Sequence, residues 1–300
     1  MSRRILITGA ASGLGRALAS ACVADGWRVL LTDVDASGGE LARLELAEGV
    51  RESGGSPDGR VAFLALDVRD EGAWAAAREW CEREWGGLDV LVNNAGVASA
   101  GPIAEVPMAD WDWIVDINLK GVVRGVRTFV PLFRAQGAGH VVNIASMAGL
   151  LNAPNMVAYN VTKAGVVSLS ETMRAELGRD GIRTTVVCPS FFATAIADNM
   201  RSTDPAFEVM ARRMVTGEAL PGPKLTAADV AAKILRAVDR ERFWALPHVE
   251  GRVLYGLKRH CPALFAAGMS GISRWLDGQV RSARSGAGTP GPRRGAGVPR

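Results

Sequence analysis

The sequence has few cysteines and few histidines, and both scarcities exclude classes of protein. Four cysteines in 300 residues, with no CxxC spacing, exclude a small disulfide scaffold and indicate reduced thiols in a cytosolic protein. The three histidines are scattered along the chain, without the spacing of metal ligands. We therefore expect a protein that binds no metal.

The chain also lacks a long apolar run. The uncharged stretch 140–162 contains four asparagines and a proline, which make it a poor membrane span. Residues 1–8 have the pattern of a strand rather than of a signal segment. No GxxxxGK[ST] turn is present, so a P-loop phosphoryl transferase is not indicated. The expected location is the cytoplasm.

The net charge of +4 arises in one segment at the end of the chain. Residues 281–300 hold five arginines and no acid, which leaves 30 basic and 31 acidic residues elsewhere. A near-neutral main part does not favour nucleic-acid binding, so no nucleic-acid partner is expected. The segment is rich in Gly, Pro, Ser and Arg, a composition typical of a disordered basic tail. A solvated terminus without a function is favoured over one that binds an anionic partner.

The pattern of the main part alternates short apolar runs with longer amphipathic segments. Hydrophobic residues make up 48% of the chain, enough for a sizeable core. Strands rich in Val, Ile and Leu are predicted at 4–8, 28–32, 61–66, 90–92, 140–145 and 184–187. Helices are predicted at 14–25, 37–52, 71–85, 119–135 and 157–177. This βαβ order predicts an α/β fold with a doubly wound parallel sheet in a single domain.

Three parts are expected along the chain. Residues 1–248 form the dinucleotide-binding and catalytic domain, 249–280 a helical extension, and 281–300 the tail. Within 249–277, two apolar stripes occur at helical spacing, one of them flanked by Arg252, Lys258, Arg259 and His260. These stripes either pack on the main body or a partner subunit, which is the favoured reading, or lie on an anionic membrane surface.

The first predicted strand leads directly into a glycine-rich turn, TGAASGLG at residues 8–15. Glycines allow a tight turn and a close approach of the backbone to a pyrophosphate, and a helix N-terminus follows. Asp33 ends the second strand, 20 residues after Gly13, where a carboxylate can bind ribose hydroxyls. Turn and carboxylate together predict dinucleotide binding, with NAD favoured over NADP because a carboxylate repels a 2′-phosphate.

The chain has only two tyrosines and five lysines against 30 arginines. Tyr159 and Lys163 stand at i and i+4 in a predicted helix, so they share one face. A cation beside a phenol lowers its pKa, which suits a proton donor and acceptor near neutral pH. Ser146, just after a predicted strand, offers a hydroxyl for a substrate oxygen. Taken alone, a Tyr-x-x-x-Lys pair is more often two surface residues of a helix.

Five motifs occur together in the order of one family: TGAASGLG, NNAG at 93–96, Asn118, Ser146 and YNVTK at 159–163. On these motifs the chain resembles the short-chain dehydrogenases/reductases with a TGxxxGxG turn, over about residues 3–245. The resemblance implies a Rossmann fold and an NAD(P)-dependent oxidoreductase that interconverts an alcohol and a carbonyl.

The resemblance also implies site residues. Tyr159 would be the catalytic acid/base, Lys163 would lower its pKa and hold the nicotinamide ribose, Ser146 would polarise the substrate oxygen, and Asn118 would keep a water in a proton relay. The implied cofactor-binding residues are Gly9, Ser12, Gly13, Leu14, Gly15, Asp33, Asp67, Val68, Asn94, Ala95, Gly96, Tyr159, Lys163, Pro189 and Thr194.

One departure from the family pattern follows the sixth predicted strand. The usual Pro-Gly pair is replaced by Pro189-Ser190, so this backbone turn is expected to differ. Thr194 stands where the threonine that binds the carboxamide is expected. Phe191 and Phe192 suit either a pocket lining or buried packing.

The substrate side is less specified. Residues 195–225 are expected to form an apolar lid, and together with the extension they predict a lipophilic alcohol or carbonyl substrate. A homo-oligomer is expected, with a dimer favoured, since the helices at 119–135 and 157–177 build a two-fold interface in the family. The alternatives are an NADP-preferring carbonyl reductase and a non-catalytic NAD-binding sensor or scaffold. The intact Ser, Tyr, Lys and Asn set argues against the sensor.

Overall fold

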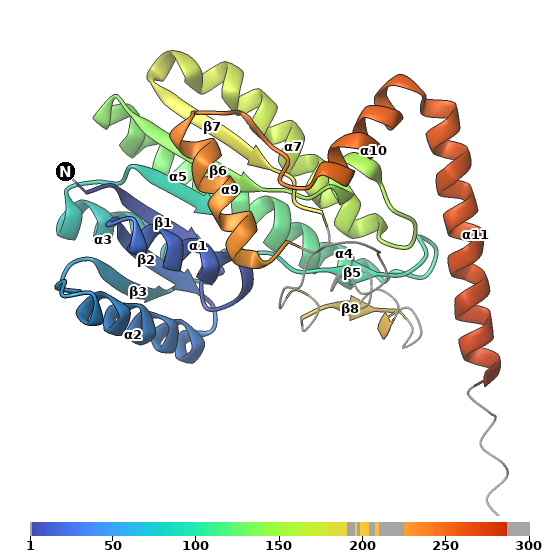
Figure 1. The fold of residues 1–300 in the computed structure, drawn as a ribbon, viewed down its shortest axis with the longest axis horizontal. Coiled ribbons are helices and arrows are strands. Elements are labelled where there is room, and N and C mark those ends of the chain that lie inside the picture. The colour runs from blue at the N-terminus through green and yellow to red at the C-terminus, as the bar shows by residue number, and fades with distance from the viewer. Residues whose placement is uncertain (1, 191–195, 197–198, 204–207, 210–224, 287–300) are drawn as a thin grey trace, which may run out of the picture.

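The computed structural model describes residues 2–190, 196, 199–203, 208–209 and 225–286, and within them the sheet is the central element. Its seven strands are all parallel and lie in the order β3-β2-β1-β4-β6-β7-β9 (Figure 1). Their bounds are β1 Arg4–Thr8, β2 Arg28–Asp33, β3 Val61–Ala65, β4 Val90–Asn93, β6 Gly139–Ile144, β7 Ile182–Val187 and β9 Trp244–Ala245. A separate short pair joins β5 Ser99–Ala100 to β8 Arg201–Ser202.

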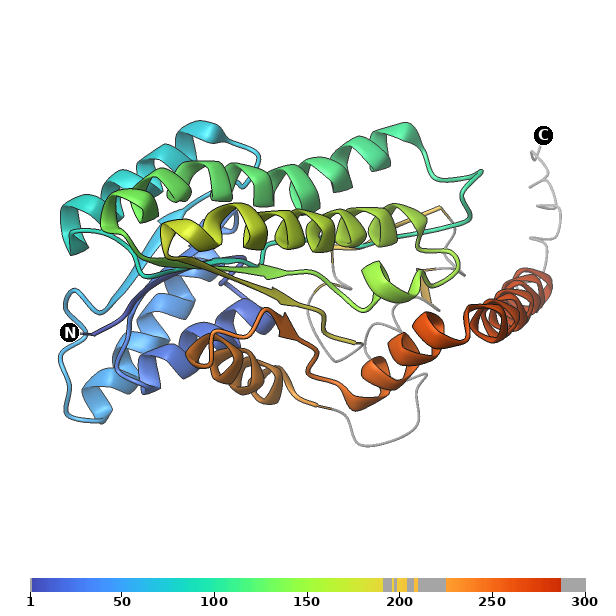
Figure 2. The same ribbon diagram turned by 90° about the horizontal axis from the view of Figure 1, so that it is seen from above.

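Helices cover both faces of this sheet (Figure 2). One face packs against α1 Gly13–Ala24, α2 Ala36–Glu52 and α9 Ala227–Asp239, and the other against α3 Glu71–Trp85, α5 Gly121–Gln136 and α7 Val157–Leu177. Smaller elements are α4 Met108–Val115, the π-helical turn η1 Asp116–Lys120, α6 Ala148–Leu151 and the 3₁₀ turn η2 Gly178–Asp180. Two further helices, α10 Val249–His260 and α11 Pro262–Gly286, end the described part.

The core consists of layers on the two sides of the strands. Along β1, Ile5 and Ile7 point to the α1 and α9 side, whereas Leu6 packs with Trp74 and Phe129 on the α3 and α5 side. Since side chains alternate along a strand, a strand buried on both faces is apolar at every position. This explains why the strands appear in the sequence as continuous apolar runs.

The doubly wound parallel sheet predicted from the sequence is confirmed. The strand expected at 4–8 and the helices expected at 71–85 and 157–177 have those bounds, and most other expected strands and helices differ by one or two residues at an end. The helix expected at 119–135 differs more, because the π-helical turn η1 precedes α5. The seventh strand, β9, was not predicted, since two residues are too few to show a periodic pattern.

The C-terminal extension is helical, as expected, but α11 continues to Gly286. Residues 281–286 are therefore part of a helix rather than of the predicted tail, and residues 287–300 lie outside the described part. Among the described helices, none is both long and apolar enough to cross a bilayer.

The strand order places a possible binding site at one edge of the sheet. From β1 the chain leads through α1 to β2 on one side, while β4 pairs with β1 on the other. Loops that leave neighbouring strands in opposite directions open a crevice at their carboxyl ends, which is where ligands bind in such sheets. Thr8, Asp33 and Asn93 end three of these strands.

Candidate active site

The glycine-rich turn joins β1 to α1 with a geometry that only glycine allows. Gly13 has a φ of 54°, in the left-handed region, and a Cβ at Gly15 would collide with the carbonyl oxygen of Gly9. Ser12 precedes α1 without a side-chain capping bond, and the first turn of α1 holds no acid. The N–H groups at this helix start therefore face the cavity described below and suit a pyrophosphate.

Asp33 lies beside this turn at the end of β2. One oxygen of its carboxylate accepts a hydrogen bond from the N–H of Ala11 at 3.0 Å, and the other accepts from the N–H of Asp35 at 3.0 Å. The next residue, Val34, is 69% exposed and lines the same cavity. Arg16, which directly follows the glycine-rich turn, forms an ion pair with Glu45 of α2. No positive side chain from the turn thus faces Asp33.

Asp67 and Val68 follow β3 and line the same region. Arg69 donates to the Asp67 carboxylate at 2.6 Å, and this hydrogen bond lowers the pKa of Asp67. The carbonyl of Val68 accepts a hydrogen bond from the indole of Trp74 at 3.1 Å. Hydrogen bonds thus fix the side chain of Asp67 and the carbonyl group of Val68, and the Asp67 carboxylate is charged at the cavity wall.

The segment after β4 is tied to the glycine-rich turn. The side chain of Asn94 donates to the carbonyl of Thr8 at 2.8 Å and to that of Gly9 at 3.1 Å. The Thr8 hydroxyl in turn accepts from the N–H groups of Asn94 and Ala95, each at 2.9 Å. Four hydrogen bonds therefore fix the relative position of two cavity walls, so that Ala95 and Gly96 line the cavity as well.

Asn118 lies in the π-helical turn η1 and is fully buried. Its side-chain oxygen accepts from the N–H of Val97 at 2.8 Å, and its amide donates to the carbonyl of Val97 at 2.8 Å. A Cβ on Gly96 would lie 3.2 Å from this oxygen and 3.4 Å from the Lys163 ammonium. Asn118 thus lies behind the cavity wall rather than in it, in a position to hold the backbone in front of Lys163.

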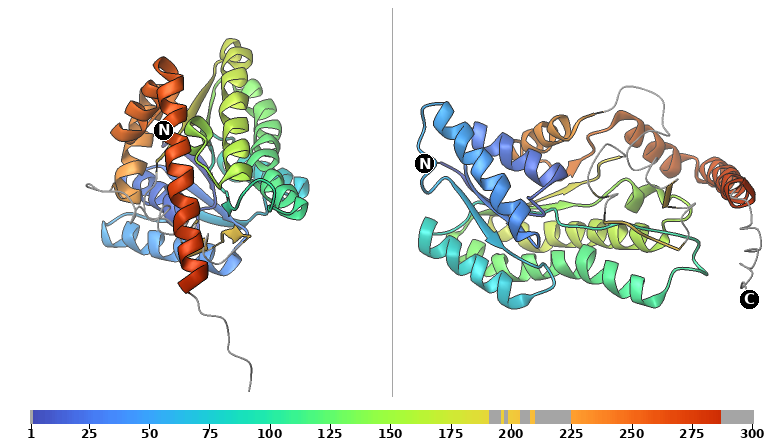
Figure 3. Two further views of the ribbon diagram at one scale, coloured as in Figure 1. Left: turned by 90° about the vertical axis from the view of Figure 1, so that its right-hand side faces the viewer. Right: turned by 90° about the horizontal axis from the view of Figure 1, so that it is seen from below.

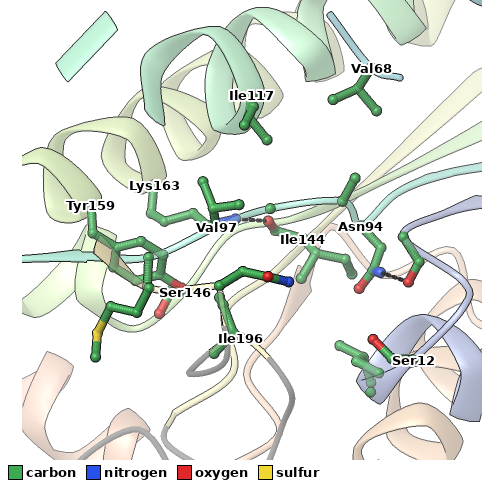
Figure 4. A pocket seen from close by; sticks show the side chains of 18 of the residues that line it. Ser12, Val68, Asn94, Val97, Ile117, Ile144, Ser146, Tyr159, Lys163 and Ile196 are labelled. Atoms are coloured by element: carbon green, nitrogen blue, oxygen red, sulfur yellow. Dashed lines mark hydrogen bonds between the residues drawn. The ribbon is translucent and has the colours of Figure 1, made fainter. Parts of the chain in front are cut away.

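Tyr159, Lys163 and Ser146 meet at one side of the cavity, across from Ser12 and Asn94 (Figure 4). Tyr159 and Lys163 stand one turn apart on α7, and the ammonium lies 5.8 Å from the centre of the Tyr159 ring. Ser146 follows β6, and its side chain is hydrogen-bonded to Tyr159. A proton donor, a second hydroxyl and a cation are therefore gathered within one site.

The sequence predicted a lowered pKa for Tyr159, whereas in this structure burial has the larger effect and raises that pKa. Burial raises the pKa of Tyr159 to about 12, although the hydrogen bond from Ser146 acts in the opposite direction. Burial also lowers the pKa of Lys163 to about 8, and its ammonium donates to the carbonyl of Ile144 at 2.9 Å. Burial is therefore the largest cause of the pKa change in both groups, and sequence spacing alone does not reveal burial.

The turn after β7 contacts both Ser146 and the C-terminal helices. The carbonyl of Pro189 accepts from the N–H of Met147 at 2.8 Å, and the N–H of Ser190 donates to the imidazole of His248 at 3.1 Å. Ser190 therefore fits the turn in place of the usual glycine. Thr194 and the pair Phe191 and Phe192 lie outside the described residues.

These segments enclose a cavity of about 670 Å³. Of the residues predicted to form the site, Gly15 and Asn118 do not line it, and Thr194 is not described. The predicted residues that do line it are Gly9, Ser12, Gly13, Leu14, Asp33, Asp67, Val68, Asn94, Ala95, Gly96, Ser146, Tyr159, Lys163 and Pro189. Nothing in the structure tests the roles assigned to them, which remain predictions.

The cavity also has an apolar wall, formed by Val97, Trp113, Ile117, Met156, Ile196 and Met200. Ile196 and Met200 belong to the apolar lid expected at 195–225, whereas the sequence did not assign the other four to the site. Trp113 was interpreted as packing, but Ile117 stands one helical turn after it and Met156 three residues before Tyr159, a spacing that pointed to one surface. Arg201 stacks on Trp113 at 4.0 Å and pairs with Asp110 at 2.8 Å. Most of the predicted lid at 195–225 lies outside the described residues.

The described residues show no cluster of three or more His, Cys, Asp or Glu that could bind a metal ion. Cys22, Cys81 and Cys188 are buried free thiols, and Cys261 is an exposed one. Burial raises the pKa of the Cys188 thiol to about 12, so this group is neutral beside Lys163. The polar chemistry of the cavity therefore comes from hydroxyls, amides, carboxylates, the Lys163 ammonium and the guanidinium groups of Arg69 and Arg201.

Comparison with known proteins identifies the family to which the chain belongs. The family described as short chain dehydrogenase matches residues 3–205. A 3-alpha-(or 20-beta)-hydroxysteroid dehydrogenase of Mycobacterium bovis is 34% identical over 193 residues, which cover 64% of this chain and 70% of that protein. A 2-(R)-hydroxypropyl-CoM dehydrogenase of Xanthobacter autotrophicus is 34% identical over 241 residues, 78% of this chain and 90% of that protein.

A solved structure is similar as well. It is a short chain dehydrogenase/reductase of Burkholderia phymatum in complex with NAD, 33% identical, with a TM-score of 0.76 over 88% of this chain and 95% of that one. The family uses NAD or NADP, and its named relatives are dehydrogenases and reductases. The chain belongs to the short-chain dehydrogenase/reductase family and is an oxidoreductase that acts on CH–OH groups.

Proposed function

We propose that the protein is an NAD(H)-dependent oxidoreductase in which Tyr159 transfers the proton during interconversion of a lipophilic alcohol and its carbonyl. The observation that carries this proposal is the shared cavity: the Ser146, Tyr159 and Lys163 group lines one end, and the glycine-rich turn and Asp33 line the other. In this proposal residues 1–248 form the catalytic domain and 249–280 an extension of it.

The fit of a dinucleotide depends on features of the chain itself. The glycine-rich turn leaves no room for a Cβ at Gly9 or at Gly15, so its backbone can approach a pyrophosphate closely. The start of α1 offers backbone N–H groups to the same pyrophosphate. Asp33 is held by two backbone N–H groups with its carboxylate at the cavity wall. These residues fit the cofactor, and hydride exchange with the substrate carbon is the chemistry that a bound nicotinamide supplies.

The chain's own residues handle the proton. Ser146 orients the substrate oxygen by a hydrogen bond and keeps it next to the Tyr159 hydroxyl. Tyr159 donates a proton to that oxygen in the reductive direction and accepts it in the oxidative direction. Lys163, held at the Ile144 carbonyl, places a positive charge beside the phenol when it is protonated and so stabilises a developing phenolate. Asn118 holds the Val97 backbone that closes this side.

NAD is proposed over NADP because of Asp33 and its surroundings. A carboxylate accepts hydrogen bonds from a ribose 2′-hydroxyl and repels a 2′-phosphate. Ser12 and Val34 line the cavity next to Asp33 without a positive charge. Arg16, which could bind a phosphate, is paired with Glu45.

A lipophilic substrate is proposed from the wall beside Tyr159. Trp113, Ile117, Met156 and Met200 present apolar and adaptable side chains there. Arg201 is neutralised by Asp110 and does not leave a free cation for an acidic substrate. A long-chain alcohol, an aldehyde or a steroid-like ketone suits this wall better than a sugar does.

The proposal extends to assembly and location. We propose a homo-oligomer, a dimer before a tetramer, through α5 and α7, which lie on the same side of the sheet. Val161 on α7 is 49% exposed and suits such an interface. A monomer in light scattering at micromolar concentration contradicts this part. The proposed location is the cytoplasm, with a peripheral membrane contact within 249–277.

A panel of alcohols and carbonyls tests the proposal, with the nicotinamide absorbance followed with each cofactor. The expected result is turnover of apolar secondary or primary alcohols or their carbonyls, with a higher kcat/KM for NAD(H) than for NADP(H). Turnover of sugars alone contradicts the substrate class, and a tenfold preference for NADP(H) contradicts the cofactor assignment.

A further inference from the structure

The two C-terminal helices form an arm that stands apart from the sheet. We call α10 and α11, residues 249–286, the C-terminal arm. In Figures 1 and 3, α10 lies at the end of the sheet where the strands have their carboxyl ends, and α11 runs across that end of the molecule beyond it. Among the described elements, α11 packs mainly on α10.

The arm is joined to the catalytic body at three points near the active site. Lys258 donates to the carbonyl of Leu150 at 2.5 Å, and Gly251 packs on the side chain of Met147. His248, just before α10, accepts a hydrogen bond from the N–H of Ser190. Ser190 lines the cavity and Met147 directly follows Ser146, which also lines it, so whatever binds the arm lies near the cavity.

The arm exposes apolar side chains to an unusual degree. Of the thirteen large apolar side chains exposed in the described part, six lie in the arm. On α11, Leu264 is 64%, Ile272 45% and Trp275 58% exposed, at positions i, i+8 and i+11. With about 3.6 residues per turn, these three lie within about a quarter-turn of one another and form one exposed apolar face. An exposed patch of this kind indicates a binding surface.

Charge around this face indicates what it binds. Residues 249–300 contain nine Lys and Arg against two acids, a net charge of +7, whereas residues 1–248 contain 26 against 29, a net charge of −3. Arg274, beside Trp275, is exposed on the flank of the apolar face, and Arg259 is exposed near the end of α10. The arm therefore combines an apolar helix face with a strong local excess of positive charge.

We propose that the C-terminal arm binds the surface of an anionic lipid bilayer, with Leu264, Ile272 and Trp275 inserted among the headgroups. An apolar helix face with basic flanks lies in the plane of such an interface, and tryptophan favours that depth. Two copies of the arm pairing with each other would bring two cationic segments together, so a second copy is a poorer fit. The proposal deepens the membrane contact named above and is independent of the catalytic assignments.

Flotation of the full chain with vesicles tests this proposal. Neutral phosphatidylcholine vesicles are compared with vesicles that contain phosphatidylglycerol, at low and at high salt. Binding is expected only to the anionic vesicles, and it should fall with salt, since each basic residue contributes about a fivefold gain in partitioning. The variant Arg259→Gln/Arg274→Gln should bind about tenfold or more weakly.

The variant Leu264→Ser/Trp275→Ser removes the centre of the apolar face and should weaken binding by at least about tenfold. Its matched control is Leu41→Ser/Leu44→Ser on α2, which removes two exposed leucines, 55% and 48% exposed, outside the arm. Turnover of a small water-soluble alcohol is measured for each variant and should not change. If the wild-type protein shows no turnover but binds anionic vesicles as expected, the catalytic proposal is refuted and the membrane proposal is not.

Three results would overturn the proposal. The first is no binding of the wild type to anionic vesicles at low salt. The second is equal loss of binding in the α2 control, which would indicate non-specific adhesion. The third is a combination of two observations: the wild type does not bind vesicles, and the Leu264→Ser/Trp275→Ser variant forms a smaller oligomer than the wild type. This result would assign the apolar face to a second copy of the chain.

Discussion

The catalytic body and the C-terminal arm use the same kinds of residue in opposite ways. In the body, Tyr159, Lys163 and His140 are buried, and their environment changes their pKa values. The arm carries counterparts, Tyr255, Lys258 and His260, none of which is fully buried. The comparison shows that residues of one type lie in different environments in the two regions, and that burial determines how far a pKa is displaced.

The difference extends to charge and apolar surface. The body buries its apolar side chains in layers on both sides of the sheet and has a net charge of −3. The arm leaves a helix face exposed and belongs to a segment with a net charge of +7. One chain thus joins a unit adapted to bind small molecules to a segment adapted to a surface, and matched substitutions in the two can separate their roles.

The lysines give a large expected contrast in rate, smaller only than that of the two tyrosines. Lys163→Arg should lower kcat by at least about a hundredfold, because a guanidinium is wider than an ammonium and does not fit the buried position at the Ile144 carbonyl. Lys258→Arg on α10 should leave kcat within about twofold of wild type, as expected of a side chain remote from the reacting atoms. Steady-state kinetics on one substrate compares them, and a similar loss in both variants would contradict the distinction between body and arm.

The histidines predict how stability depends on pH. His140 contacts the hydroxyl of Thr185 at 2.8 Å, and burial lowers its pKa from 6.5 to about 4. The folded state favours the neutral imidazole. The contribution of His140 to the free energy of unfolding is therefore complete above pH 6.5 and is lost as the pH falls through 4. The loss amounts to about 3 kcal/mol.

Urea unfolding of the wild type and of His140→Gln at pH 7, 5 and 4 measures this effect. The variant should lose less stability on acidification than the wild type does. His260→Gln, at an exposed position of the arm, should keep the wild-type pH dependence. Identical pH curves for wild type and His140→Gln would show that acid sensitivity arises elsewhere.

Lys163 should also destabilise the folded body at neutral pH. A pKa lowered from 10.5 to about 8 corresponds to about 3 kcal/mol of destabilisation below pH 8. Lys163→Met removes this cost but also loses a hydrogen bond of about 1 kcal/mol, so a net gain of about 2 kcal/mol is expected at pH 7. The gain should shrink as pH rises from 8 to 10.5, because the folded-state pKa lies below the unfolded one.

Denaturant unfolding at pH 7 and pH 10 checks both the sign and the trend. Lys258→Met on the arm is the control. It removes a hydrogen bond and the contact of the ammonium with the Phe265 ring, so a loss of about 1 kcal/mol is expected. A Lys163→Met variant less stable than wild type at both pH values would show that the ammonium stabilises the site.

Asp33 gives the smallest expected effect. Asp33→Ala should narrow the preference for NAD(H) over NADP(H) by about tenfold, because hydrogen bonds to a charged group are lost and repulsion of a 2′-phosphate is removed. Asp277→Ala on the arm should leave the ratio of the two kcat/KM values unchanged. An unchanged ratio in Asp33→Ala would move cofactor selection to another part of the cavity.

The sequence predicted those parts of the site that depend on local spacing. Gly13 in its turn, Asp33 at a strand end and Tyr159 one helical turn from Lys163 follow from chain order. The apolar wall was predicted only in part, through the lid that contains Met200. Trp113 and Met156 come from two other segments, which only the tertiary fold brings to the cavity.

Burial was the second property that the sequence did not reveal. The pattern of α7 placed a cation near the phenol of Tyr159, but not the desolvation that raises its pKa to about 12. The stripe at 264–276 was visible as a helical period, whereas the exposure of Trp275 beside a buried Leu276 depends on how α11 packs. Both features depend on how whole elements pack against one another, which a local pattern does not contain.

The two tyrosines of the chain provide the most direct test of the central claim, that the body performs the chemistry through Tyr159. Tyr159→Phe and Tyr255→Phe are compared for kcat on the best alcohol of the panel and for the Kd of NADH by fluorescence titration. The predicted result is a fall in kcat of at least about a thousandfold for Tyr159→Phe alone, with NADH binding within about threefold of wild type in both variants. A Tyr159→Phe variant that keeps wild-type kcat would contradict the claim.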